Sequence, residues 1–253
     1  MNALIHTITR GRLSMLPVLL ALPLLLGVAA CSDDDDDSGT KPMIGETSLR
    51  ALHLSPDAPA VDIFLNNGGT AAVSDLSFQE GTPYLAIPEG TYEIDIAASG
   101  STANDAVLSV SGLDLMEDSY YTAVAYNTLN GIAALALVDD YMGLTAGKIR
   151  VRAIHTAAGV GQVDIWNVTD PGSPAALYPD FDFGDVGAYL DLPVAAYTLG
   201  FDVNNDAVPD LSFAIPALPE GTVANVFAVR ASNGDVFLLA QVQSGATVRI
   251  DPL

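Results

Sequence analysis

The sequence predicts an all-β protein made of two tandem β-sandwiches, immunoglobulin-like or transthyretin-like, which follow a cleaved signal peptide and an acidic linker. Three observations predict this class. One sequence pattern occurs twice, apolar and polar residues alternate with a period of two, and turn residues separate the alternating runs. No segment after Cys31 shows the long 3.6-residue period of an amphipathic helix.

The repeat is visible in short stretches that return at nearly constant spacing. Arg-Ala-Leu-His at 50–53 returns as Arg-Ala-Ile-His at 152–155, and Val-Asp-Ile-Phe at 61–64 returns as Val-Asp-Ile-Trp at 163–166. Further matching pairs are Phe78 and Phe183, Tyr84 and Tyr189, Pro88 and Pro193, Tyr92 and Tyr197, and Asn-Gly at 130–131 and 233–234. A tandem duplication explains these matches, with copies at 47–144 and 147–253.

Each copy consists of short alternating runs separated by turn signals. Tyr92, Ile94 and Ile96 alternate with acidic residues, and the corresponding run at 197–203 alternates in the same way. That period marks strands with one buried face. The Asn-Gly pairs are typical of hairpin turns. We expect about seven short strands per copy, which is the strand count of a β-sandwich.

The N-terminus has the layout of an export signal. A basic start precedes an apolar stretch at 13–26 and small residues at 27–30. An uncleaved membrane helix is the alternative, but the stretch is short for a span and contains Pro17 and Pro23. Val28-Ala29-Ala30-Cys31 resembles the lipobox of bacterial lipoproteins. This resemblance implies a signal peptide at 1–30, lipid on Cys31, and a membrane as partner through that lipid.

An acidic tether is predicted at 31–46, because the carboxylates of Asp33–Asp37 repel one another and cannot form a core. A spacer is the simpler interpretation of this run. It also resembles the surface-export signal of some Gram-negative lipoproteins, so surface exposure is a hypothesis. Ser32 after the cysteine favours the outer membrane by analogy with enterobacterial sorting. The expected location is therefore the cell envelope.

Charge and cysteine content exclude several classes. The chain has 31 acidic residues against 9 lysines and arginines, a net charge of −22, and no basic stripe. Binding to nucleic acid is therefore not expected. Cys31 is the only cysteine, so no disulfide forms within one chain, whereas lipidation explains a single cysteine directly.

The start of the first copy carries a family resemblance. Residues 50–64, Arg-Ala-Leu-His-Leu-Ser-Pro-Asp-Ala-Pro-Ala-Val-Asp-Ile-Phe, resemble the signature of the bacterial family called domain of unknown function 4397. The second copy departs from it, because Ala-Ala-Gly-Val-Gly at 157–161 replaces Ser-Pro-Asp-Ala-Pro. The resemblance implies an exported, β-rich protein and no particular activity.

An arginine, a histidine and an aspartate recur at matching positions of both copies and form the first candidate site. They are Arg50, His53 and Asp62 in the first copy, and Arg152, His155 and Asp164 in the second. One histidine per copy is few for a metal that prefers several nitrogen or sulfur ligands. We interpret the set as structural, since charged cross-strand pairs fix register. No Gly-x-Ser-x-Gly, zinc-protease or phosphate-loop motif is present, so no catalytic residue is predicted.

The second candidate site is an acidic loop in the second copy. It spaces oxygen ligands as calcium loops do, with side chains and one carbonyl from Asp202, Asn204, Asp206, Val208 and Asp210. Ala207 replaces the usual glycine, and Phe213 stands where an EF-hand has a glutamate. The alternative is a hairpin loop stabilised by its own Asx side chains. Apart from this calcium, no cofactor is expected.

Trp166, the only tryptophan, has two interpretations. Exposed beside Tyr178 and Phe181 it would stack on a sugar or a protein, and buried it would belong to the core. Together these observations favour a lipid-anchored, non-enzymatic binding or adhesion module with a protein or polysaccharide ligand. The alternative is a calcium-stabilised carbohydrate- or polymer-binding lipoprotein, and an envelope enzyme is third.

Overall fold

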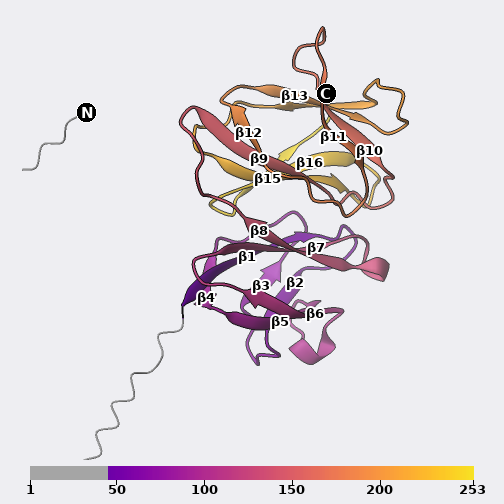
Figure 1. Ribbon diagram of the computed structural model, residues 1–253. Helices are drawn as coiled ribbons and strands as arrows, with labels where there is room; N and C mark the ends of the chain where they lie inside the picture. The colour runs from indigo at the N-terminus through magenta and orange to yellow at the C-terminus, as the bar shows by residue number, and fades with distance from the viewer. Residues whose placement is uncertain (1–44) are drawn as a thin grey trace, which may run out of the picture. The chain divides into compact units, whose positions relative to one another are not determined.

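The computed structural model describes residues 45–253, which form part of one compact unit. The predicted signal peptide, Cys31 and nearly all of the tether lie outside the described residues. Within residues 45–253 no helix has the length and hydropathy to cross a membrane. The described chain is all-β, with four sheets that make two sandwiches (Figure 1).

The first copy has eight strands and two short 3₁₀ helices, one more strand than we expected. The strands are β1 (Glu46–Leu54), β2 (Val61–Leu65), β3 (Val73–Leu76), β4 (Leu85–Pro88), β5 (Gly90–Ala98), β6 (Leu108–Leu115), β7 (Tyr120–Tyr126) and β8 (Ala133–Asp139). The 3₁₀ helices are η1 (Ala103–Asp105) and η2 (Leu129–Gly131). Sheet A has the order β4-β1-β7-β8, and sheet B has the order β3-β2-β5-β6.

The second copy repeats this topology with nine strands. They are β9 (Lys148–His155), β10 (Val163–Asn167), β11 (Ala175–Phe181), β12 (Leu190–Pro193), β13 (Tyr197–Asp202), β14 (Leu211–Ile215), β15 (Val223–Arg230), β16 (Val236–Val242) and β17 (Thr247–Ile250). Sheet C has the order β12-β9-β15-β16-β17, and sheet D has the order β11-β10-β13-β14. The additional strand β17 extends sheet C beside β16.

Strand pairing explains how the sequence pattern becomes two sandwiches. The Asn-Gly pairs lie between antiparallel partners, β7 with β8 and β15 with β16, as predicted for hairpins. The first strand of each copy pairs in parallel with the seventh, β1 with β7 and β9 with β15. Parallel neighbours need a long connection, and the intervening strands of the other sheet supply it.

Sheet A is covered on both faces. One face packs on sheet B around Leu49, Ile63 and Ile94. The other face packs on sheet C of the second copy, where Leu52 and Leu54 join a cluster with Phe227 and Phe237. Eight of the nine residues of β1 are therefore buried or half-buried, and β1 does not alternate as a one-faced strand would.

Candidate functional site

The recurring arginines lie at the contact between the two copies, where they share one buried carboxylate. Asp139, at the end of β8, has a side chain that is only 1% exposed. Its Oδ2 accepts hydrogen bonds from Arg50 Nη2 at 3.3 Å, Tyr84 Oη at 2.5 Å and Thr122 Oγ1. Its Oδ1 accepts from Arg152 Nη2 at 2.9 Å, Asn225 Nδ2 at 2.8 Å and Tyr189 Oη at 3.3 Å. Each carboxylate oxygen thus accepts hydrogen bonds from side chains of one copy only.

The surroundings of this carboxylate, which we call the Asp139 node, are matched between the copies. The guanidinium of Arg50 lies over the ring of Tyr84 at 4.6 Å, and that of Arg152 lies over Tyr189 at 4.4 Å. Burial, then the charge of Asp139, raises the pKa of both tyrosines well above the usual range. Both phenols therefore stay protonated and donate to Asp139 at neutral pH. The node is a structural link between the copies.

The recurring histidines are buried near the ends of β1 and β9, where they bond to the segment that follows each strand, and they do not approach Arg50 and Arg152. Successive side chains of a strand point to opposite faces. Arg50 and His53 are three residues apart in β1, so they lie on opposite faces of that strand. His53 Nε2 bonds the carbonyl of Pro59 at 3.2 Å, while Nδ1 accepts the backbone N–H of Ser55 at 3.3 Å. In the second copy, His155 repeats both bonds with Gly161 at 2.9 Å and Ala157 at 3.4 Å.

Asp62 and Asp164 lie in sheets B and D and bind backbone amides. Asp62 accepts N–H bonds from Asp75 at 2.8 Å and Gly100 at 2.9 Å, and Asp164 accepts one from Asp180 at 2.7 Å. Asp62 shares no hydrogen-bond partner with Arg50 or His53. The six recurring residues do not converge on one cleft, and each has a partner that explains it structurally.

Acid should destabilise the protein through the two histidines. Burial lowers the pKa of His53 and of His155, although a backbone carbonyl bond acts to raise each one. The folded state therefore binds fewer protons than the unfolded state below the ordinary histidine pKa of about 6.5. Stability is complete above that pH and declines as the pH falls below it. Urea midpoints between pH 7.5 and 5 should fall in the native sequence and stay flat in a His53→Gln, His155→Gln variant. An equal slope in both would contradict this origin.

The loop at 202–210 is held together by its own acidic side chains. Buried Asp202 accepts backbone N–H bonds from Asn204 at 3.1 Å, Asn205 at 2.8 Å and Ala207 at 2.7 Å. Burial acts to raise the pKa of Asp202, but the backbone amides outweigh it and lower the pKa. Ala207 takes a left-handed φ of 65°, which glycine would adopt without strain.

Other side-chain oxygens of this loop are also engaged. Asp206 accepts the N–H of Val208 at 2.9 Å, and Asp210 accepts that of Val203 at 2.9 Å. Among residues 45–253 no three acidic, histidine or cysteine side chains are grouped to hold a metal ion. The geometry supports the hairpin alternative, and calcium would have to replace these amide bonds. Calcium binding here stays a prediction from the sequence.

The three aromatic residues of the second copy do not form one surface. Phe181 is buried, and Tyr178 is half-buried against the same core. Trp166 is half-buried and follows the buried Ile165 in β10, so its ring lies on the other face of sheet D. Its indole nitrogen is buried without a hydrogen-bond partner among the described residues. Of the two interpretations of Trp166, an exposed surface shared with Tyr178 and Phe181 does not agree with this arrangement.

A hollow of about 420 Å³ lies at the end of the second sandwich, where the family signature departs from its pattern. We call it the end hollow. Glycines 159 and 161 and Arg230 line it, together with apolar side chains from Val160, Val163, Phe201, Leu211 and Val236. Small-molecule sites commonly combine this size with apolar walls and few polar groups.

Arg230 is the charged group of the end hollow that lacks an acidic partner. Its Nε and Nη1 make only long contacts with the carbonyls of Gly234 at 3.3 Å and Ala158 at 3.4 Å. The four other arginines of the described chain each pair with an aspartate within 3.3 Å. No carboxylate among residues 45–253 lies within 4.0 Å of Arg230, so its guanidinium is available to a ligand.

In the first copy, side-chain hydrogen bonds bridge the equivalent end of the sandwich. Asn127 holds the place of Arg230 there, and its Nδ2 donates to the carbonyl of Gly131 at 2.8 Å. Asp57 reaches across to accept the N–H of Leu129 at 2.7 Å, while Gly159 stands in its place in the second copy. The second copy has lost a bridging carboxylate and gained a guanidinium.

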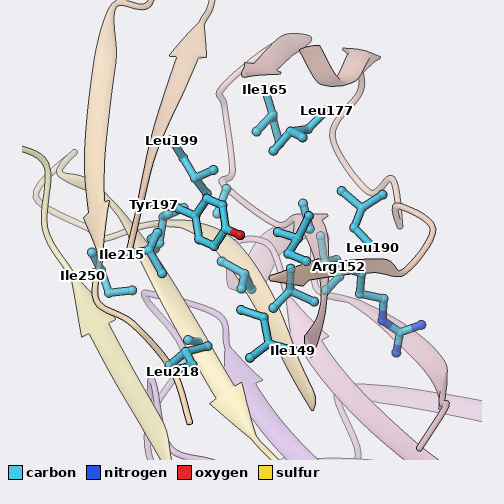
Figure 2. Close-up of a pocket in the computed structure, with 18 of the residues that line it drawn as sticks. Ile149, Arg152, Ile165, Leu177, Leu190, Tyr197, Leu199, Ile215, Leu218 and Ile250 are labelled. Carbon is cyan, nitrogen blue, oxygen red and sulfur yellow. The ribbon is translucent and has the colours of Figure 1, made fainter. Parts of the chain in front are cut away.

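A second cavity, of about 160 Å³, lies between sheets C and D and is lined almost wholly by apolar side chains. Figure 2 shows Tyr197, Leu199, Ile215, Leu218 and Ile250 around it. We call it the core cavity. Protein interiors rarely hold voids larger than a water molecule, and an empty one of this size costs about 4 kcal/mol.

The corresponding core of the first copy is better filled. Two cavities in that core measure about 20 and 40 Å³. Tyr121 pairs with Leu49 in the first copy and is buried in the core, whereas Ala224 pairs with Val151 in the second. The second copy thus lacks a tyrosine ring at an equivalent position. Neither the end hollow nor the core cavity was predicted from the sequence.

Comparisons with known proteins agree with part of this description. The model of a family described as Domain of unknown function (DUF4397) matches residues 47–166, which is the first copy, β9 and most of β10. No curated protein matches the chain. The chain is similar to the crystal structure of a fimbrial assembly protein from Parabacteroides distasonis ATCC 8503. That match has 12% identity and a TM-score of 0.22, over 82% of this chain and 100% of the other. A likeness this low carries no argument about function.

Proposed function

We propose that this chain is a lipid-anchored, non-enzymatic binding module of the bacterial cell envelope. In this proposal Cys31 carries the lipid, the acidic tether extends from an outer membrane, and both copies are DUF4397-like sandwiches of immunoglobulin-like or transthyretin-like type. The end hollow of the second copy is the recognition surface. The observation that carries the proposal is the guanidinium of Arg230, which faces an apolar hollow without an acidic partner.

The chemistry of the end hollow favours an organic carboxylate with an apolar body. The guanidinium offers paired N–H donors that fit a carboxylate, and the valine and phenylalanine side chains fit the apolar part. Neither ring nitrogen of His155 is available for proton transfer, because Gly161 and Ala157 occupy both. This arrangement supports binding rather than catalysis.

Removing the guanidinium should weaken carboxylate binding. Calorimetric titration with phenylacetate is the measurement, on the mature chain with Cys31→Ser to prevent lipidation. We expect Arg230→Asn, which installs the residue of the first copy, to weaken binding about 10- to 100-fold, as expected for a charged hydrogen bond.

Two controls separate direct contact from general electrostatics. Arg249→Asn removes the same charge from an exposed pair with Asp251 and should leave phenylacetate binding unchanged. Phenylacetamide, which is neutral, should bind weakly to the native sequence. Equal binding of the amide, or equal weakening by both variants, would reject the site at Arg230.

Lipid anchoring is tested separately from ligand binding. Protein expressed in a Gram-negative host should partition into the detergent phase of Triton X-114, because acyl chains on one cysteine anchor stably. Cys31→Ser should move it to the aqueous phase. Detergent partitioning of the Cys31→Ser protein would contradict anchoring through this residue.

A further inference from the structure

The core cavity carries an inference beyond the proposed function. We infer that it binds a linear, uncharged hydrocarbon chain. It shares only Phe201 and Ala228 with the lining of the end hollow, and Arg230 does not line it. The two proposed sites therefore rest on different observations, and an experiment can reject one without rejecting the other.

The polar groups at the edge of the core cavity are already engaged. The hydroxyls of Tyr178 and Tyr197 donate to the carbonyls of Ala188 and Pro193, each at 2.7 Å. Figure 2 shows the guanidinium of Arg152 directed away from the other lining side chains, and its Nε and Nη2 bind Asn225 and Asp139. A charged or strongly polar ligand would lose its hydration and find no partner inside.

The residues that line the core cavity come from the whole second sandwich. Every strand of the second copy contributes at least one side chain, from β12 at one edge of sheet C to β17 at the other. Neighbouring strands lie about 4.8 Å apart, so the lining residues are spread across the width of the sandwich. A linear chain can contact more of these residues than a compact ring can.

Apolar residues that line the core cavity reach the surface at several points, including both edges of sheet C. Val248 on β17 is 50% exposed, and Leu192 on β12 and Leu218 after β14 are half-buried, although all three line the cavity. Apolar cavities of comparable volume stay free of water and take up small apolar molecules. The first copy has no β17, and its corresponding cavities are too small for such a ligand.

The test uses 1-octanol as the probe and the unlipidated mature chain, with the melting temperature followed against alcohol concentration. A ligand that binds only the folded state raises the melting temperature as its concentration rises. We expect 1-octanol to raise it, and octanoate and the ring alcohol cyclohexanol to do so much less. No rise with 1-octanol, or an equal rise with cyclohexanol, would overturn the inference.

Variants locate the effect. Ala240→Leu adds volume inside the core cavity and should weaken 1-octanol binding at least about tenfold, because it occupies space that the chain needs. Ala136→Leu makes the same change at the equivalent register position of the first copy and should leave binding intact. If Ala240→Leu does not fold, Leu199→Ala enlarges the cavity and should favour 1-decanol over 1-octanol. Unchanged chain-length preference in Leu199→Ala would overturn the assignment.

Discussion

Replacing Asp139 with alanine is expected to lower the free energy of unfolding by about 3–5 kcal/mol. The change removes one carboxylate that six side-chain donors share, and it leaves Arg50 and Arg152 buried at the contact between the copies. Leaving a buried charge without its partner is costlier than never having buried the pair. Urea unfolding of the two proteins measures the difference.

An exposed pair provides the control for this prediction. Asp251→Ala removes the partner of Arg249. The side chains of Arg249 and Asp251 are each at least 36% exposed, so this change should lower the free energy of unfolding by at most about 1 kcal/mol. A loss of about 1 kcal/mol or less for Asp139→Ala as well would contradict the node. It would mean that the two guanidinium groups reach water when the carboxylate is removed.

Replacing Phe227 with alanine is expected to cost about 3–5 kcal/mol, as for other large side chains removed from a packed core. Phe227 belongs to the second copy, is fully buried, and packs in one cluster with Leu52 and Leu54 of the first. The two copies share this core, so both should lose stability together.

Hydrogen exchange shows whether the shared core couples the copies. In Phe227→Ala, amides of β7 in the first copy should exchange faster, along with those of β15 in the second. Faster exchange restricted to the second copy would contradict the coupling and leave two independent sandwiches.

Much of the fold could be predicted from local sequence patterns. The run from Tyr92 to Ile96 lies in β5, and the matching run from Tyr197 lies in β13, as the period of two predicts. Both Asn-Gly pairs lie in the connections of antiparallel strands, although Asn130 and Gly131 belong to the 3₁₀ helix η2 and not to a two-residue turn. These features depend on neighbouring residues, which a single sequence displays directly.

Features that depend on long-range packing could not be predicted. The parallel pairing of β1 with β7, and the burial of sheet A on both faces, join segments far apart in the chain. Leu49–Leu54 has apolar residues at positions of both parities, which is compatible with burial on two faces but does not identify the partner.

The candidate sites show the same division. The repetition of Arg50 as Arg152 was visible, but Asp139 followed by Asp140 is typical of a loop, and its role needs both copies in contact. The signal for the core cavity was the replacement of Tyr121 by Ala224. That change is readable in an alignment of the copies, whereas the resulting volume depends on how the neighbours pack.

We propose that ligand recognition is concentrated in the second copy. Nuclear magnetic resonance of methyl groups and arginine Nε–H groups, with phenylacetate and then 1-octanol added, tests it most directly. We expect phenylacetate to shift the signal of Arg230 and 1-octanol to shift the methyl signals of Leu199 and Ile215. The methyl signals of Ile63 and Ile94 in the first copy should not shift. Shifts of equal size in the first copy, or none in either copy, would contradict it.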